Sequence, residues 1–236
     1  MDRVDYEYFG EKGDEFFWFI GKNELLIKMA EEQGPFDKVL NLGCGVGENS
    51  NSFSAFGDVI SADVDLFSVS CAKKYTDVVR TDACNISFKS NTFDCVILSD
   101  VLEHIEEDSR VVNEIILATK PGGLIVITVP AIKFLFSTHD LALGHHRRYS
   151  RKELLDLCKD LHIDRIEYWN FFNLLIVAPF RLIKQFLKLS SRPDPTKVPE
   201  LINKILLFLM RIENKIITKG HSLPIGLTLV VLCRKQ

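Results

Sequence analysis

The stretch VLNLGCGVGENS (39–50) decides the fold, because it joins a short apolar run to a predicted helix through three glycines. Gly43, Gly45 and Gly47 would let a ligand approach the backbone, and the start of the helix offers free N–H groups. The alternative is a turn whose glycines serve only the tight packing of strand against helix.

A second apolar run, DVISAD (58–63), ends in Asp63 about one β-α-β unit later. An acid at that place can hold the two hydroxyls of a ribose. A dinucleotide site would follow the pattern GxGxxG, but Glu48 occupies the third glycine position. A pyrophosphate would fit badly beside that carboxylate, whereas an adenosyl ligand without phosphate tolerates it. The pattern therefore favours an adenosyl ligand over NAD.

Strands and helices alternate along the chain, which predicts an α/β fold with a parallel sheet covered on both faces. Ser150 is the expected N-cap of a helix in the second half. We expect seven strands, the last antiparallel, with a helical insertion before it. The predicted strands are 38–42, 58–63, 77–82, 93–100, 124–130, 162–169 and 225–235, and the predicted helices are 14–32, 66–74, 106–120, 150–160, 173–190 and 199–218.

Composition sets the class of protein. The 236 residues are 47% hydrophobic and 26% charged, which is ordinary globular usage and excludes wholesale disorder. A net charge of −3 argues against a general nucleic-acid binder. The six cysteines form no CxxC pair, so they read as reduced thiols of a cytoplasmic protein. The acidic N-terminal stretch does not resemble a signal peptide, and no apolar run reaches the ~18 residues of a spanning helix.

The charge is unevenly distributed. Residues 181–220 hold nine basic and three acidic side chains, a net +6, whereas the first 180 residues carry −11. The two predicted helices of this basic segment are amphipathic, with Arg181, Lys184 and Lys188 on one and Lys204, Arg211 and Lys215 on the other. Such helices can lie on an anionic membrane surface. The alternative is an insertion that packs on the sheet or forms a dimer contact, with solvated lysines.

Four motifs resemble the class I S-adenosylmethionine-dependent methyltransferases in order and spacing over about residues 36–130. The flanking segments are similar to a small-molecule subgroup that includes quinone-pathway O-methyltransferases and enzymes of surface-glycan synthesis. The four motifs are GCGVG with Asp63, TDACNISF (81–88), FDCVILSDVLEHI (93–105) and KPGGLIVITVP (120–130), and the flanking segments are FFWF (16–19) and GHHRRYSRKEL (144–154).

The resemblance implies a Rossmann-like seven-stranded methyltransferase sheet in one domain. Its parts would be an N-terminal helical lid (1–35), a cofactor-binding core (36–130), an acceptor-side segment (131–169), an amphipathic helical insertion (170–222) and the last strand (223–236). The implied reaction is methyl transfer from S-adenosylmethionine to a small or lipid-linked acceptor, on oxygen. The implied location is cytoplasmic, with peripheral contact at the inner membrane surface left open, as is the oligomeric state.

The resemblance also assigns cofactor contacts. Asp63 would accept the ribose hydroxyls, Asp82 would accept from the adenine amino group, and Ser99 would lie near the sulfonium. The family usually has an acid at the position of Asn41, so the charge is lost there. A turn-capping role is the alternative for Asp82, and Asp65 is better explained as a helix N-cap. The full cofactor set is Asn41, Gly43, Cys44, Gly45, Asp63, Val64, Asp82, Ala83 and Ser99.

Candidate acceptor-side residues follow the fourth and fifth strands, at the sheet edge where ligands bind. A histidine can remove a proton near neutral pH, and the candidates are His104, His139 and His145. The candidate acceptor contacts are Asp100, Arg147, Arg148 and Tyr149. The alternative for the two arginines is pairing with Asp140, Glu153 or Asp156 to pin their loop.

Asp100, Glu103 and His104 could together bind a divalent metal, because oxygen and imidazole donors cluster there, but we predict no metal. Two other classes of function stay open: a non-catalytic S-adenosylmethionine-binding module, and an NAD-binding oxidoreductase. Detectable turnover with any acceptor would distinguish an enzyme from the binding module. Titration with the two cofactors would distinguish a methyltransferase from an NAD-binding oxidoreductase.

Overall fold

A computed structural model describes residues 15–47, 49–186 and 198–236. Its centre is a seven-stranded sheet in the order β3-β2-β1-β4-β5-β7-β6. The first five strands are parallel to one another, and β7 runs antiparallel between β5 and β6. The predicted sheet with an antiparallel last strand is therefore confirmed. The strands are β1 (Lys38–Leu42), β2 (Asp58–Asp63), β3 (Asp77–Arg80), β4 (Phe93–Ser99), β5 (Thr119–Pro130), β6 (Leu161–Trp169) and β7 (Thr228–Lys235).

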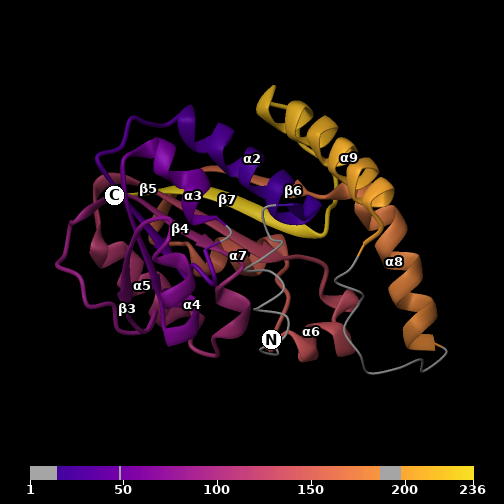
Figure 1. The fold of residues 1–236 in the computed structure, drawn as a ribbon, viewed down its shortest axis with the longest axis horizontal. Helices are drawn as coiled ribbons and strands as arrows, with labels where there is room; N and C mark the ends of the chain where they lie inside the picture. The colour runs from indigo at the N-terminus through magenta and orange to yellow at the C-terminus, as the bar shows by residue number, and fades with distance from the viewer. Residues whose placement is uncertain (1–14, 48, 187–197) are drawn as a thin grey trace.

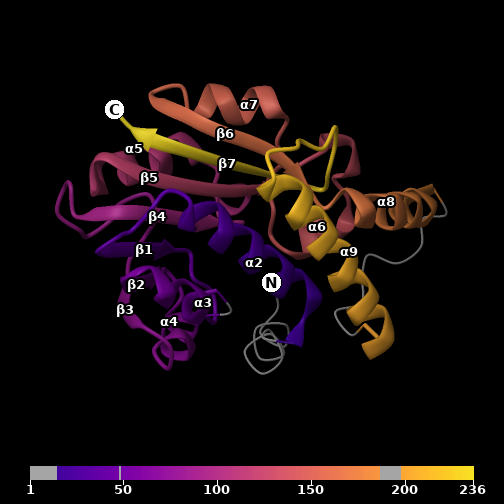
Figure 2. The ribbon, with the colours of Figure 1, turned by 90° about the horizontal axis from the view of Figure 1, so that it is seen from above.

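Helices cover both faces of the sheet (Figures 1 and 2). They are α2 (Phe17–Glu31), α3 (Ser50–Phe53), α4 (Leu66–Ala72), α5 (Asp108–Ala118), α6 (Thr138–Ala142), α7 (Arg151–Leu157), α8 (Phe171–Phe186) and α9 (Glu200–Thr218). Short 3-10 turns are η2 (Ser54–Phe56), η3 (Leu102–His104) and η4 (Lys133–Leu135). The expected helical insertion between the sixth and seventh strands is thus present as α8 and α9.

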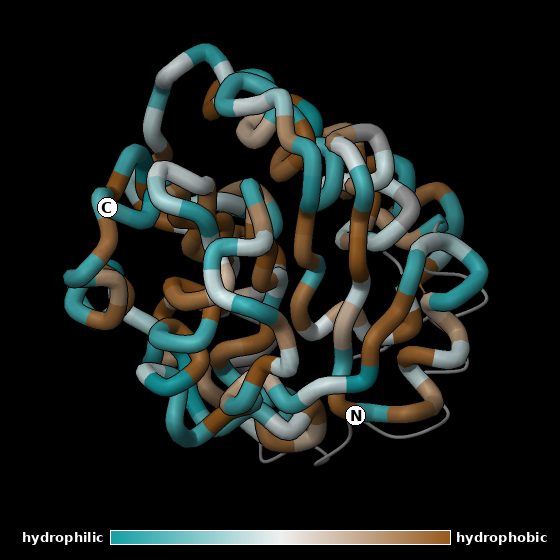
Figure 3. Tube along the Cα trace, turned by 90° about the vertical axis from the view of Figure 1, so that its left-hand side faces the viewer, coloured by the Kyte–Doolittle hydropathy of each residue, from teal (hydrophilic) through white to brown (hydrophobic). Residues whose placement is uncertain are grey.

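Alternating side chains of the central strands feed two separate cores. On β4, Cys95 and Ile97 join one core while Val96 and Leu98 join the other, because successive side chains of a strand point to opposite faces. The first core packs against α2 and α9, and the second against α5 and α7. Figure 3 shows the hydrophobic segments inside and hydrophilic stretches in the surrounding turns. Burial on both faces explains why these strands read as continuous apolar runs.

Several predicted boundaries differ from the structure, and two of them were wrong for local reasons. The helix predicted over 106–120 spans only Asp108–Ala118, because Thr119 already pairs with Phe93 and opens β5. The third strand stops at Arg80, since Asp82 turns the chain by accepting a hydrogen bond from the Cys84 N–H at 2.8 Å. The expected caps hold: Ser150 accepts from the Glu153 N–H, and Asp65 accepts from the Ser68 N–H. Helix α6 was not predicted.

Buried polar groups anchor the helical insertion. The indole N–H of Trp169 donates to Asn214 Oδ1 at 2.9 Å, and Asn214 Nδ2 donates to the Gly21 carbonyl at 2.8 Å. The Glu213 carboxylate accepts the Phe171 N–H at the start of α8, and burial raises its pKa to about 7. These contacts join β6, α2, α8 and α9 at one point.

No helix in the described ranges combines the length and the apolar character needed to cross a bilayer. The parts of the predicted helix 173–190 beyond Phe186 lie outside the described residues.

We expect Asn214→Ala to lower the free energy of unfolding by about 2–4 kcal/mol, because it leaves the buried Trp169 N–H without its acceptor and removes the hydrogen bond to the Gly21 carbonyl. Lys215→Ala, at an exposed position of the same helix, is the matched control and should change stability little. Urea unfolding followed by circular dichroism measures both. Equal stability of the two variants would contradict the anchoring role of Asn214.

Candidate functional site

The glycine turn after β1 is tied to β2 by its own backbone. The N–H groups of Gly43 and Cys44 both donate to the Ala62 carbonyl, at 2.7 and 3.0 Å. Gly43, Gly45 and Gly47 have φ values of +74°, +54° and +97°, which glycine adopts without strain. The turn is therefore held open at the carboxyl edge of the sheet, beside the end of β2.

Two of the glycines also serve packing. A Cβ at Gly43 would lie 2.4 Å from Val101 Cγ2, and one at Gly47 would lie 2.9 Å from Ala72 Cα. The packing explanation therefore accounts for Gly43 and Gly47 without a ligand. Gly45 is different, because its N–H points at a carboxylate. Glu48, which set the dinucleotide pattern aside, lies outside the described residues.

Asp63 ends β2, beside the glycine turn. One carboxylate oxygen accepts the Gly45 N–H and the other accepts the Asp65 N–H, each at 2.9 Å. Burial raises the pKa of Asp63, although these backbone hydrogen bonds oppose the rise. Beside it, Val64 is 59% exposed and Leu66 is equally open. A fixed carboxylate next to uncovered apolar side chains suits a ligand with both a diol and a flat apolar ring.

Asn41 is buried behind the turn, where its amide is used by the protein. Nδ2 donates to Ser50 Oγ at 3.2 Å, and Ser61 and Thr76 continue this chain of hydroxyls at 2.9 and 2.7 Å. A carboxylate accepts hydrogen bonds but has no N–H to donate. The hydrogen bond from Asn41 to Ser50 therefore explains why an amide can stand where the resemblance leads us to expect an acid.

Asp82 and Ala83 form the turn after β3. Asp82 is exposed, and one of its oxygens caps the turn through the Cys84 N–H. The turn-capping alternative is therefore present in the structure. Capping engages Oδ1 and leaves the other oxygen as a possible acceptor for a ligand.

The residue directly after β4 has a strained backbone. Ser99 is buried, and the next residue, Asp100, has a φ of +58°. The Asp100 carboxylate accepts from Lys22 Nζ at 2.7 Å and from Thr128 Oγ1 at 2.8 Å. Burial opposes ionisation, yet Lys22 holds the pKa of Asp100 below its usual value. Left-handed conformations at non-glycine residues cluster at functional sites.

Lys22 was missed by the sequence reasoning. It lies on α2 with its side chain only 3% exposed, and its Nζ also lies 5.5 Å from the Phe19 ring centre. The signal was available: a lysine at helical spacing from Trp18, Leu25, Leu26 and Met29 occupies the apolar stripe of the helix. A charge on that stripe requires a buried partner.

Next to Asp100 lies a group of three ionisable side chains. Glu103 is fully buried, and neither of its oxygens has a hydrogen-bond partner among the described residues. Burial and the nearby Asp100 raise its pKa well above the usual range. The rings of His104 and His145 meet edge to face, with centres 4.6 Å apart. Desolvation and His145 lower the pKa of His104 to about 4, so its imidazole is neutral at physiological pH although it reaches solvent.

One ligand atom from each of Glu103, His104 and His145 lies within 4.8 Å of the others. Oxygen and imidazole donors suit several divalent metals, so this set is compatible with an ion. It differs from the metal-ligand set considered from the sequence, because His145 takes the place of Asp100. The absence of a metal from the reaction remains a prediction.

His145 is oriented by a buried acid. Its Nδ1 lies 3.3 Å from Asp140 Oδ1, and Asp140 also accepts the Ser137 N–H that begins α6. His139 is half-buried on α6, one residue before Asp140. The structure therefore brings His104 and His145 together, and places the His145 ring against the Asp140 carboxylate.

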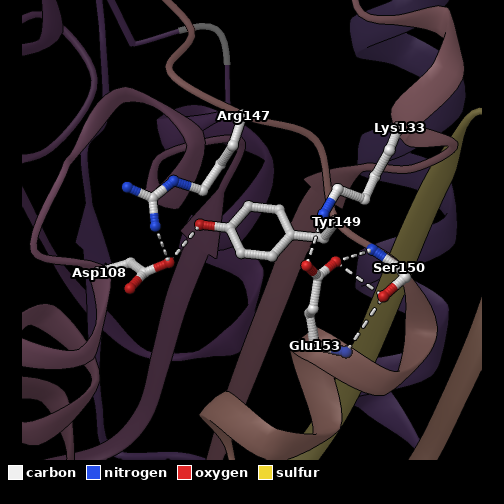
Figure 4. Close-up of polar contacts among 6 residues, drawn as sticks. All are labelled: Asp108, Lys133, Arg147, Tyr149, Ser150 and Glu153. Atoms are coloured by element: carbon white, nitrogen blue, oxygen red, sulfur yellow. Dashed lines mark hydrogen bonds and ion pairs between the residues drawn. The ribbon is translucent and has the colours of Figure 1, made fainter.

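The arginine loop is pinned by protein carboxylates. Arg148, 6% exposed, donates to Asp140 at 2.7 Å and to the Ala131 carbonyl at 3.0 Å. Arg147 Nη1 and the Tyr149 hydroxyl both donate to Asp108 Oδ2, at 2.9 and 2.8 Å (Figure 4). Burial and Asp108 raise the pKa of Tyr149 far above its usual value.

This geometry favours the pinning alternative for Arg148, and the Tyr149 hydroxyl is likewise engaged by protein groups. The predicted partner Asp140 is the observed one for Arg148, whereas Asp108 was not foreseen for Arg147. Glu153 pairs instead with Lys133 at 2.6 Å (Figure 4). Arg147 is only half-buried and stays the more accessible candidate for an anionic acceptor.

Known proteins share the core of this chain. Residues 40–127 match the family model described as a methyltransferase domain. The demethylmenaquinone methyltransferase of Paenarthrobacter aurescens is 34% identical over 94 residues, which are 38% of this chain and 37% of that protein. The sterol 24-C-methyltransferase of Saccharomyces cerevisiae is 30% identical over 129 residues, 49% of this chain and 33% of that enzyme. The matched part thus spans less than half of either relative.

Among solved structures, a SAM dependent methyltransferase from Archaeoglobus fulgidus has the same fold, with a TM-score of 0.57 over 90% of this chain and 94% of that chain at 17% identity. At that identity the likeness concerns the fold alone. It agrees with the matched domain model and with the four motifs around the glycine turn. Residues 40–127 of this chain therefore match a methyltransferase domain, and the described sheet and helices have the fold of the solved methyltransferase.

Proposed function

We propose that this protein transfers a methyl group from S-adenosylmethionine to a small, lipid-like acceptor, on oxygen. The observation that carries the proposal is Asp63, held by two backbone N–H groups beside the glycine turn with Val64 uncovered next to it. Two relatives, a demethylmenaquinone methyltransferase and a sterol 24-C-methyltransferase, support an acceptor of lipid-like character.

The residues present fit the adenosyl group. Asp63 would accept both ribose hydroxyls, Val64 and Ala83 would flank the adenine, and Asp82 would accept from its amino group. Gly43, Cys44 and Gly45 would line the methionine part, with Asn41 supporting the turn from behind and Ser99 near the reacting end. When bound, S-adenosylmethionine supplies a methyl group already activated by its sulfonium.

Alignment of the acceptor is the main task left to the protein, together with removal of a proton from its hydroxyl. His145 is the better-placed base, because Asp140 orients its Nδ1 and leaves Nε2 for the acceptor. The low pKa of His104 makes it a weak proton acceptor, so its part would be to pack against His145. His139 and Arg147 remain candidates on the same loop.

Two alternatives keep their discriminating tests. A module that binds S-adenosylmethionine without turnover would show affinity and no methyl transfer to any acceptor. An oxidoreductase would bind NAD in a titration. The methylated atom is a separate question, because the yeast relative is named for a carbon position; mass spectrometry of the product identifies it.

A lipid-linked acceptor would reach the protein from a membrane. Peripheral contact at the inner membrane surface of an otherwise cytoplasmic protein therefore belongs to the same proposal.

Asp63→Ala should weaken S-adenosylmethionine binding by about 10- to 150-fold, since a charge-assisted contact to a diol contributes about 1.5–3 kcal/mol. Asp63→Asn, which keeps one acceptor oxygen, should fall between. Calorimetric titration measures the affinity, and Asp58→Ala at the exposed start of β2 is the control. Unchanged affinity in Asp63→Ala would remove the ribose assignment.

His145→Gln should reduce the rate of methyl transfer roughly 100-fold or more, because a positioned base contributes about that much. Affinity for S-adenosylmethionine should stay at the wild-type value. His146→Gln, at the exposed neighbouring position, is the matched control. Full activity of His145→Gln on the true acceptor would exclude His145 as the base.

Arg148→Ala should lower the free energy of unfolding by about 3–5 kcal/mol, because it strands the buried carboxylate of Asp140 without its cation. Arg147→Ala should cost less than about 1 kcal/mol, since that side chain is partly solvated. Thermal and urea unfolding compare the two. If Arg148→Ala is as stable as the wild type and fails only in transfer, then Arg148 holds the acceptor after all.

A further inference from the structure

Helix α9 presents an apolar face that nothing in the described structure covers. Leu201 is 72% and Phe208 63% exposed, and Ile202 and Ile205 are exposed between them. Leu201, Ile205 and Phe208 follow helical spacing, so they share one side. The opposite side of α9, with Met210 and Ile217, is buried in the core shared with α2. The exposed row is therefore a second apolar face of the helix.

Neighbouring elements also expose apolar side chains. Leu175 and Ile176 of α8 are exposed, as is Phe134 of η4. Leu174 of α8 packs with Leu135 of η4 and with Leu227, which fixes the start of α8 to the sheet edge. We call the exposed side chains of α8 and α9 the apolar arm; they are Leu175, Ile176, Leu201, Ile202, Ile205 and Phe208.

The apolar arm lies at the ligand-binding edge of the sheet. In Figure 1, α8 and α9 stand at the side opposite the end of β7. Because β7 is antiparallel to β5, the parallel strands end toward α8 and α9. Asp63, Asp100 and the glycine turn follow the ends of those strands. The site and the apolar arm therefore belong to the same edge of the molecule.

Charge favours a negatively charged partner. Residues 181–220 carry a net +6 in a chain whose total is −3. Lys215 and Lys219 are exposed, with no ion pair in the described part of the chain. Two other basic residues are already paired inside the protein: Lys204 with Glu200 at 2.5 Å and Arg211 with Glu24 at 2.6 Å.

Those two ion pairs change the expected mode of attachment. The sequence assigned Lys204 and Arg211 to a basic binding face, but their charges are largely neutralised by protein carboxylates. Arg211 in fact holds α9 against α2 through Glu24. Attraction by basic residues is then the weaker contribution, and the exposed apolar side chains are the stronger one.

We propose that the apolar arm docks on an anionic bilayer, with its apolar side chains at the boundary between headgroups and acyl chains and its lysines at the headgroups. Amphipathic helices with phenylalanine and leucine on one face and lysines on the flank bind membranes in this way. Docking would bring the ligand-binding edge of the sheet to the lipid from which the acceptor of the proposed function is drawn.

Co-sedimentation of the full chain with vesicles tests the surface, using phosphatidylcholine alone and phosphatidylcholine mixed with phosphatidylglycerol. The wild type should bind the mixed vesicles more tightly and keep part of its binding at high salt. Phe208→Ser should weaken binding about tenfold or more, because it removes a large apolar side chain from the contact. Leu117→Ser, at an exposed apolar position of α5, is the matched control and should bind like the wild type.

A polarity-sensitive fluorophore on Phe208→Cys gives a second measurement that does not depend on lost binding. Its emission should shift to the blue on mixed vesicles, whereas the same label on Leu117→Cys should not respond. No vesicle binding by the wild type, equal binding by Phe208→Ser, or a label that stays in water overturns the proposal. A wild-type dimer that Phe208→Ser dissolves, without vesicle binding, assigns the surface to a second copy instead.

Calorimetry with S-adenosylmethionine on the same proteins keeps the two proposals apart. If the wild type binds vesicles but no S-adenosylmethionine, the proposed function fails and the docking surface stands. If S-adenosylmethionine binds and vesicles do not, the docking surface fails alone.

Discussion

The close passage of the turn after β1 past the loop after β4 constrains everything built at this edge of the sheet. Gly43 and Val101 approach so closely that a single methyl group at position 43 would overlap the valine. The two strands are neighbours in the sheet although fifty residues separate them in the chain. Because position 43 carries no side chain, the turn can pass directly over Val101. The glycine turn, Asp63 and Asp100 then follow the ends of three adjacent strands, β1, β2 and β4.

A second constraint on this edge of the sheet comes from a helix outside the sheet. Lys22 ties the N-terminal helix to Asp100, and Asp100 is held in a backbone conformation that it would not choose alone. Removing either partner would leave the other charge largely buried without an opposite charge beside it, which would lower the stability of the fold. The helix that precedes the sheet is therefore part of the site and not merely a cover for it. Glu103, whose carboxyl oxygens have no hydrogen-bond partner in the described part of the chain, is fully buried near the same pair, and this burial raises its pKa.

The sequence predicted what depends on periodicity and on local capping. The strands around Asp63 and Cys95, and the caps at Asp65 and Ser150, follow from patterns within a few residues. What could not be predicted depends on partners far along the chain. Arg147 contacts Asp108, Lys22 contacts Asp100, and Asn214 joins Trp169 to Gly21. No local sequence pattern predicts these contacts, because the partners lie far apart in the chain. The positions of Asp63 and Asp100 at the ends of strands follow from the same local patterns, whereas the contacts of the two arginines depend on which carboxylates the fold brings near.

The position of β7 has a consequence for how the molecule is made. This strand fills the slot between β5 and β6, and it pairs with both along nearly its whole length. Synthesis from the N-terminus produces β5 and β6 first, with more than fifty residues still to come before their shared neighbour exists. During that interval both strands expose unpaired backbone edges, which are sites where other chains can add. The long helical insertion is thus translated while the sheet is still split in two, and the burial that closes the structure arrives with its last strand.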